Sequence, residues 1–140
     1  MRTLRLRRHL WLLWMVVGAS LLYAGWSAYR RVGEASLLRT HSELMALLVA
    51  GDFEQAYRLT TGEYRARHTV GEFRAAFGHY RGESHYLPRS PTVISFGLFS
   101  AEVYAYEDPG LFQFLNGPSF YYRREGGRWR FTGEGAHYLD

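Results

Sequence analysis

The side chains best suited to acid–base chemistry in this 140-residue chain are four histidines and one aspartate: His41, His68, His79, His85 and Asp52. General acid–base catalysis needs such a group in a pocket that shifts its pKa. His41 lies among apolar residues of a helical pattern and is the candidate for an interior position. A single histidine on such a face is more often a hydrogen-bonded structural residue, so we expect no catalytic residue.

Metal, phosphate and nucleophile motifs are missing from the sequence. The six histidines show neither His-x-His nor i, i+4 spacing, and they form no local cluster with carboxylates. The absence of cysteine excludes disulfides, thiolate zinc sites and a cysteine nucleophile. No glycine-rich phosphate loop or nucleophile elbow is present. We therefore expect no metal and no cofactor.

Tyrosine is more abundant than a core of this size requires. Tyrosines lining an interior would form an apolar ligand pocket, and its candidate residues are His41, Tyr57, His85, Tyr86, Tyr104 and Tyr106. Tyrosine with nearby arginine is also typical of protein contact surfaces. The candidate partner surface is Tyr121, Arg123, Arg124, Arg128 and Arg130. Alternation along 101–107 leaves open whether Val103 or Tyr104 faces the core.

The basic charge of the chain lies at its N-terminus. The formal net charge is +4, and the pI is near 9.6. Residues 1–31 hold six of the seventeen arginines and no acid, while the remainder holds eleven arginines and all thirteen acids. The rest of the chain is therefore mildly acidic, and we expect no nucleic-acid partner.

An uncharged apolar run occupies residues 10–29, between the two arginine groups. Its 20 residues are enough for a helix to cross the ~30 Å hydrocarbon core of a bilayer. Trp11 and Trp14 lie near one end, and Trp26 and Tyr29 lie near the other, as expected at membrane interfaces. The run predicts a transmembrane helix.

The flanking arginines predict the orientation of this helix. Four arginines precede it and two follow it, which favours a cytoplasmic N-terminus. We expect a cytoplasmic basic tail at 1–9, the transmembrane helix at 10–29, and a domain at 30–140 outside the inner membrane.

Two further expectations concern the same helix. Cleavage after Ala24 or Ala28 would place Leu22 or Trp26 at the −3 position, so we expect a retained anchor rather than a cleaved signal peptide. Ser20, Ala24 and Ala28 recur every four residues, a stripe that allows close helix packing.

Helical patterns dominate the first half of the domain. Apolar residues at helical spacing over 34–50 predict a helix that Gly51 ends. Asp52 with Gln55 starts a second helix, which Thr60-Thr61-Gly62 breaks. Thr69 with Glu72 forms a capping box for a third helix ending near Gly78.

Beyond a loop at 81–91, the pattern changes to a period of two. Strands are expected at 92–99, 101–107, 119–125 and 128–132, with Ile94, Phe96 and Leu98 on one side of the first. Gly126-Gly127 predicts a tight hairpin. The fold class is α+β: three helices packed on a curved antiparallel sheet that forms a cone around the long helix.

Two segments resemble a known superfamily. The run LLVAGDFEQAYRLTTGEYRARHTVGEFRAAFG, residues 47–78, resembles the helical start of the nuclear-transport-factor-2-like, cystatin-like cone superfamily. The hairpin YYRREGGRWRFTGEG, residues 121–135, is similar to its last two strands. The resemblance covers about 90 residues and rests on structural motifs rather than catalytic ones.

The resemblance implies several functions. Some members are isomerases, dehydratases or cyclases, and many are not catalytic. Membrane-anchored members belong to conjugation, secretion and lipid-transport complexes, and a short tail, one span and one outside domain are similar to that group. We therefore expect a non-catalytic accessory or assembly subunit, with the lipid bilayer and other membrane subunits or a second copy as partners. The alternative is a small-molecule or lipid binder using the cone interior.

Overall fold

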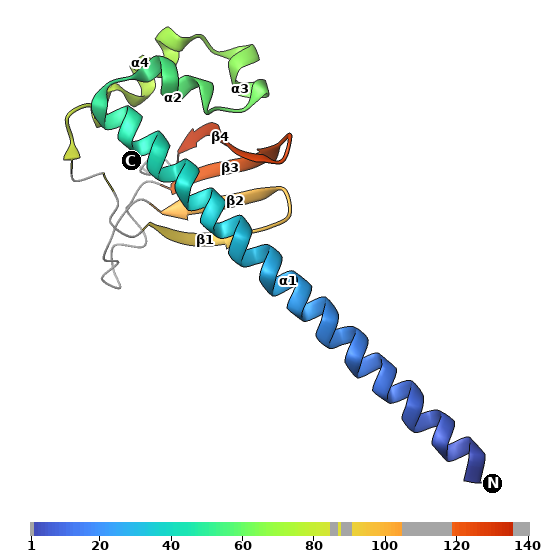
Figure 1. Cartoon of the computed structure of the whole chain (residues 1–140). Helices are drawn as coiled ribbons and strands as arrows, with labels where there is room; N and C mark the ends of the chain where they lie inside the picture. Colours follow the sequence, from blue (N-terminus) through green and yellow to red (C-terminus); the bar gives the residue numbers. More distant parts are fainter. Residues whose placement is uncertain (1, 85–86, 88–90, 105–118, 136–140) are drawn as a thin grey trace, which may run out of the picture. The chain divides into compact units, whose positions relative to one another are not determined.

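The computed structural model describes residues 2–84, 87, 91–104 and 119–135 (Figure 1). The chain forms two compact units, 1–33 and 34–140. Helix α1 (Arg2–Ala50) runs without a break through the boundary between them.

The first unit is the N-terminal part of α1. Its large apolar side chains are exposed along the helix, with Trp11 70 % and Leu22 78 % exposed. This helix is long and apolar enough to cross a membrane, a property that it shares with signal sequences. The predicted span at 10–29 lies within this helix, which has the length and apolar composition that a membrane span requires.

Helix α1 ends as the glycine predicts. The N–H of Gly51 donates to the carbonyl of Leu48 at 3.1 Å, and the N–H of Asp52 donates to the carbonyl of Leu47 at 2.9 Å. Gly51 has a φ of 78°, so this is a Schellman motif that pairs the last free carbonyls.

Helices α2 (Phe53–Arg58) and α4 (Val70–Phe77) begin at the predicted caps. Asp52 Oδ1 accepts the Gln55 backbone N–H at 3.1 Å. At α4 the capping box is complete, because Thr69 Oγ1 accepts the Glu72 N–H at 3.2 Å and Glu72 Oε2 accepts the Thr69 N–H at 2.6 Å. Glu72 Oε2 accepts hydrogen bonds from the backbone N–H of Thr69 and from its hydroxyl, and these two bonds lower the pKa of Glu72 below its usual value.

The capping box makes a stability prediction. Replacing Thr69 with alanine leaves the Glu72 N–H without its side-chain acceptor. We expect Thr69→Ala to lower the free energy of unfolding by about 1 kcal/mol, measured by urea unfolding of the full chain in detergent. Thr40→Ala is the matched control, because Thr40 Oγ1 donates only to the Ser36 carbonyl one turn back in α1. Equal stabilities of the two variants would contradict the prediction.

Helix α3 (Gly62–Arg67) was not predicted. Thr60-Thr61-Gly62 breaks α2, as expected, but Thr61 then starts another helix. Its Oγ1 accepts the Tyr64 N–H at 3.2 Å, so a threonine interpreted as a breaker is an N-cap.

Strands β1 (Thr92–Phe96), β2 (Ser100–Tyr104), β3 (Ser119–Glu125) and β4 (Arg128–Gly135) form one antiparallel sheet in that order. Gly126-Gly127 joins β3 to β4, as predicted. At the β4 edge, the Phe131 N–H donates to the Leu59 carbonyl at 3.0 Å and its carbonyl accepts the Thr61 N–H at 2.8 Å. The expected strand residues 105–107 lie outside the described residues. The α+β class is confirmed.

A β-bulge makes one alternation prediction wrong. Val93 pairs with Val103, but Ser95 pairs with Glu102, so Ile94 is an extra residue in β1. Ile94 is therefore 48 % exposed, while Val93 and Phe96 pack against the core. The strand also ends at Phe96, so Ile94, Phe96 and Leu98 do not share a face.

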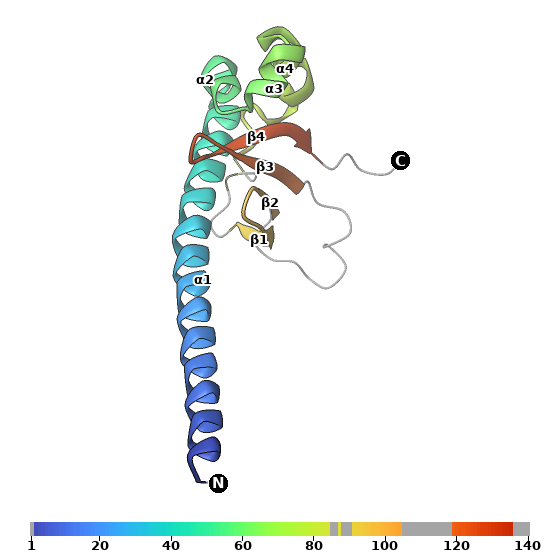
Figure 2. The same cartoon turned by 90° about the vertical axis from the view of Figure 1, so that its right-hand side faces the viewer.

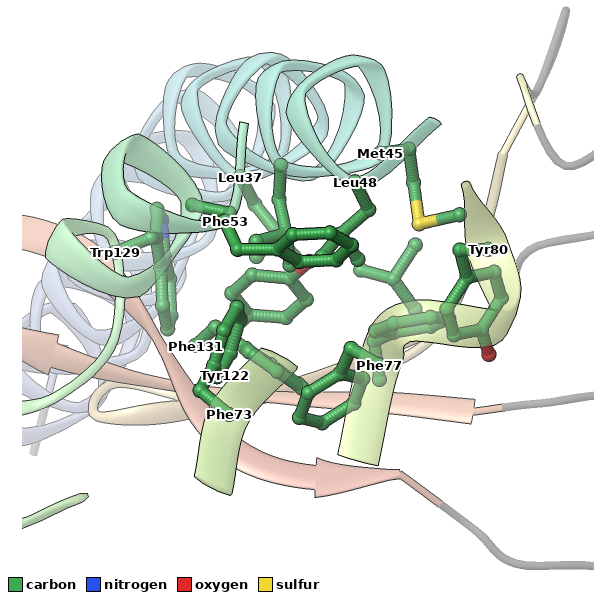
Figure 3. Packing of buried hydrophobic residues seen from close by; sticks show 14 of the residues in the cluster. Leu37, Met45, Leu48, Phe53, Phe73, Phe77, Tyr80, Tyr122, Trp129 and Phe131 are labelled. Carbon is green, nitrogen blue, oxygen red and sulfur yellow. The ribbon is translucent and has the colours of Figure 1, made fainter. Parts of the chain in front are cut away.

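One aromatic core fills the space between the Glu34–Ala50 part of α1, the short helices and the inner face of the sheet (Figure 3). Val103 is fully buried, so of the two alternatives for β2 it is Val103 that faces the core. The core residues are Leu37, Leu44, Met45, Leu48, Phe53, Ala56, Phe73, Phe77, Tyr80, Ala101, Val103, Phe120, Tyr122, Trp129 and Phe131.

Candidate functional site

The interior contains one buried polar pair. His41 on α1 and Tyr122 on β3 are both buried, and His41 Nδ1 lies 2.7 Å from the Tyr122 hydroxyl. The imidazole also makes edge contacts with the rings of Phe120 and Tyr122. The hydrogen bond joins residues 81 positions apart and ties the helix to the sheet.

The second ring nitrogen of His41 has no partner. Among the described residues, nothing lies within hydrogen-bond distance of Nε2, although it is buried. Either tautomer therefore leaves one imidazole nitrogen unsatisfied, at a cost of about 1–3 kcal/mol. Burial lowers the pKa of His41 from 6.5 to about 4, so the ring is neutral at pH 7. Burial also raises the pKa of Tyr122, which stays protonated.

The other expected pocket residues do not join this pair in the described structure. Tyr57 packs its ring against Tyr64 and Phe73, and its hydroxyl donates to the His68 carbonyl at 2.5 Å. His85, Tyr86 and Tyr106 lie outside the described residues, as does the side chain of Tyr104. His68 and His79 are exposed.

A cavity of about 300 Å³ lies between α3, α4 and the exposed side of β3 and β4. We call it the α3–β3 groove. Its lining residues are Thr61, Glu63, Tyr64, Arg67, His68, Glu72, Ala76, Arg123, Thr132 and Gly133. In contrast to the interior, this groove is lined largely by charged and polar side chains.

A carboxylate between two guanidinium groups forms one wall of the groove. Glu63 Oε1 lies 2.8 Å from Arg67 Nη2, and Glu63 Oε2 lies 2.7 Å from Arg123 Nη1. These side chains are between 47 % and 71 % exposed, so the two ion pairs add little stability, but they bring both guanidinium groups to one carboxylate. Each guanidinium keeps further N–H donors for a bound group.

An aromatic platform forms the opposite wall. The Tyr64 ring stacks on His68 with centroids 4.4 Å apart, and its edge meets Phe73. Burial, followed by the negative charge of Glu72, raises the pKa of Tyr64. The ring also lies directly over Gly133, where an added Cβ would be 2.0 Å from two ring carbons.

The expected partner surface divides between the two faces of the sheet. Tyr121 and Arg123 are exposed on β3, and Arg123 pairs in register with Arg130 on β4. Arg124 instead pairs with Trp129 and holds its guanidinium 5.7 Å from that indole ring. The prediction of one arginine surface is therefore wrong for Arg124, because alternation places it on the face of the buried Trp129. Arg128 is exposed beside the hairpin turn.

Most groove residues were missed by the sequence interpretation. Arg123 was predicted as part of a partner surface, and His68 was named only as an acid–base candidate. The Glu63 and Arg67 pair has the i, i+4 spacing of a helical ion pair, but that signal required recognising α3. Nothing in the sequence indicated that Glu63 would meet Arg123, 60 residues away.

Comparison with known proteins gave no relative: no family model, curated protein or solved structure matches this chain. Within the described part of the chain, no group of three or more histidine, aspartate and glutamate side chains is placed to hold a metal ion. The fold and the site define an α+β protein with a long apolar N-terminal helix and a charged groove beside its antiparallel sheet.

Proposed function

We propose that this protein is a single-span membrane protein, with its N-terminus in the cytoplasm and its domain outside. The domain acts as a non-catalytic accessory or assembly subunit that binds a partner protein through the α3–β3 groove. The nuclear-transport-factor-2-like cone belongs to this proposal as its fold family. It is supported by the α+β order of helices followed by antiparallel strands.

The charge pattern around the apolar helix supports the membrane part of the proposal. Residues 10–29 carry no charge, and four arginines precede them. The exposed tryptophans and leucines of this segment would be costly in water and favourable in lipid.

The observation that carries the proposal is the contrast between the interior and the groove. Aromatic and aliphatic side chains pack around His41, whereas the groove is lined largely by charged and polar side chains. This packing favours surface recognition over the alternative of a small-molecule binder, lipid binder or isomerase-like enzyme using the interior.

The groove favours a partner with an acidic group. Arg123 and Arg67 share one carboxylate, and their side chains are 53 % and 71 % exposed. A partner carboxylate can accept hydrogen bonds from the remaining donors of both groups while an apolar portion rests on Tyr64. Such charge-assisted contacts give specificity as well as affinity.

Charge reversal tests this proposal. We expect Arg123→Glu to weaken partner binding at least about tenfold, or about 1.4 kcal/mol, because it places a second carboxylate beside Glu63. The full chain is extracted in mild detergent, and the size and composition of its complex are compared with wild type.

Arg39→Glu is the matched control, because Arg39 is an exposed arginine on α1 and outside the groove lining. Urea unfolding of both variants verifies that the domain remains folded, since loss of an exposed ion pair costs under about 1 kcal/mol. A monodisperse wild-type monomer without a partner, or an Arg123→Glu complex equal to that of Arg39→Glu, contradicts the proposal.

A further inference from the structure

The turn of the β1–β2 hairpin displays apolar side chains to solvent. Phe99 is 72 % exposed and Leu98 is 52 % exposed, and Ile94 adds a third exposed side chain on β1. A single exposed apolar residue is ordinary, but three within six positions of one hairpin form a patch. No residue of this patch belongs to the α3–β3 groove.

The backbone holds this hairpin turn in place. The Gly97 N–H donates to the Ser100 carbonyl at 2.8 Å, which closes the turn. The Phe99 carbonyl accepts the Arg124 N–H at 2.8 Å, which fastens the turn to β3. The bulge in β1 turns Ile94 outward, toward solvent. The apolar side chains are thus presented by a paired sheet.

An exposed cation lies near this patch, at the neighbouring β3–β4 turn. The backbone of Arg124 bonds to Phe99, and its guanidinium lies over Trp129. Arg128 is exposed at the adjacent β3–β4 turn. The turn residues 97–100 carry no charge themselves. An apolar tip with the exposed Arg128 at the adjacent turn matches a lipid interface, where apolar side chains enter the acyl boundary and cations meet anionic headgroups.

A short connection joins the predicted span to the Glu34 end of the domain. Only four residues separate Tyr29, the last residue of the predicted span, from Glu34, the first residue of the second unit. In Figures 1 and 2, the strands follow one another along the Glu34–Ala50 part of α1, with β4 nearest α2–α4 and β1 toward the Glu34 end. The β1–β2 hairpin therefore belongs to the tethered end of the domain.

We propose that the β1–β2 hairpin turn, with Leu98 and Phe99 at its tip, is a second membrane contact that inserts into the lipid interface. This inference rests on the membrane anchoring stated under the proposed function. The contact would restrict the orientation of the domain on the bilayer while leaving the α3–β3 groove available to a partner protein.

Lipid-borne quenching tests this proposal. The chain has no cysteine, so a single introduced cysteine carries the only thiol-linked fluorophore. Full-length Leu98→Cys, with Phe99 intact, is labelled and reconstituted into phosphatidylcholine–phosphatidylglycerol vesicles with nitroxide-labelled lipid in both leaflets. Insertion to the ~5–10 Å depth of interfacial segments predicts a roughly twofold or greater loss of emission. We expect stronger quenching by a shallow nitroxide than by a deep one.

Two further label positions separate the possible failures. Ala75→Cys lies on the exposed side of α4, in the helical layer, and we expect no quenching there. Leu21→Cys lies within the predicted span, and we expect strong quenching there. Quenching at position 21 but not at 98 overturns the hairpin contact and leaves the anchor intact, whereas quenching at neither overturns both.

The remaining outcomes also decide the proposal. A blue-shifted but unquenched label at position 98 means that protein, such as a second copy of the chain, covers the turn. Equal quenching at 98 and 75 means that the domain lies on lipid without selecting this hairpin. Adding Phe99→Ser to Leu98→Cys is expected to reduce the quenching at position 98 while leaving position 21 unchanged, and undiminished quenching contradicts a specific role for Phe99.

Discussion

Acidification from pH 7 to pH 4 is expected to lower the free energy of unfolding by about 3 kcal/mol through His41. Burial against Phe120 and Tyr122 lowers the pKa of the imidazole from 6.5 to about 4. Only burial causes this shift, so the folded domain keeps His41 mainly neutral until the pH approaches 4.

The sign of the effect follows from the protons bound by each state. Between pH 6.5 and pH 4 the unfolded chain protonates His41, whereas the folded domain does not. Lower pH therefore favours the unfolded chain. The contribution of neutral, buried His41 to the free energy of unfolding is present above pH 6.5. It is lost as the pH falls from 6.5 to 4, and it changes little below pH 4.

The control replaces both members of the buried pair. His41→Leu with Tyr122→Phe removes the titrating group without leaving the tyrosine hydroxyl unpaired, and such paired replacements are often nearly neutral. Urea unfolding of the full chain in detergent, followed by near-ultraviolet circular dichroism, gives the stability of wild type and variant at each pH. Carboxylates titrate in both proteins, so the difference between the two curves isolates His41. Parallel curves between pH 7 and pH 4 would show that His41 is not buried as a neutral ring.

Replacing Gly133 with alanine is expected to cost about 3 kcal/mol, for two independent reasons. Gly133 has a φ of 80°, a conformation that disfavours any residue with a Cβ. The added Cβ would also lie 2.0 Å from two carbons of the Tyr64 ring. That ring must move, and it forms one wall of the α3–β3 groove.

Gly127→Ala is the matched control for backbone strain. Gly127 also has a φ of 80°, but a Cβ added there meets no atom within 4 Å. Its expected cost is the backbone part alone, about 1–2 kcal/mol. Urea unfolding measures both variants, and partner binding at the groove should weaken only with Gly133→Ala. Equal stability losses in the two variants would mean that the Tyr64 ring does not lie over Gly133.

Local features were predictable because a few adjacent residues determine them. The glycine that ends α1, the caps of α2 and α4, and the Gly126-Gly127 turn all depend on hydrogen bonds between residues close in sequence. The uncharged run at 10–29 and the arginine distribution are likewise read directly from composition. The α+β class followed from the change in apolar period.

The predictions of which sheet face a side chain occupies were wrong for Ile94 and for Arg124. One extra residue at Ile94 reverses the faces of β1, because successive strand side chains point to opposite sides. The same alternation separates Arg124 from Arg123, although both are adjacent arginines in a strand that was predicted correctly. Helix α3 was missed because its capping threonine follows directly on the residues that end α2.

The sequence by itself determined the apolar helix, its flanking charges, the helix caps and the hairpin, since these depend on chain-local hydrogen bonding and on composition. Only the tertiary structure decided that His41 meets Tyr122, that Glu63 meets Arg123, and that the Phe99 carbonyl meets the Arg124 N–H. Those contacts join residues far apart in the chain. They depend on strand register and helix packing, which are set by the whole core rather than by neighbouring residues.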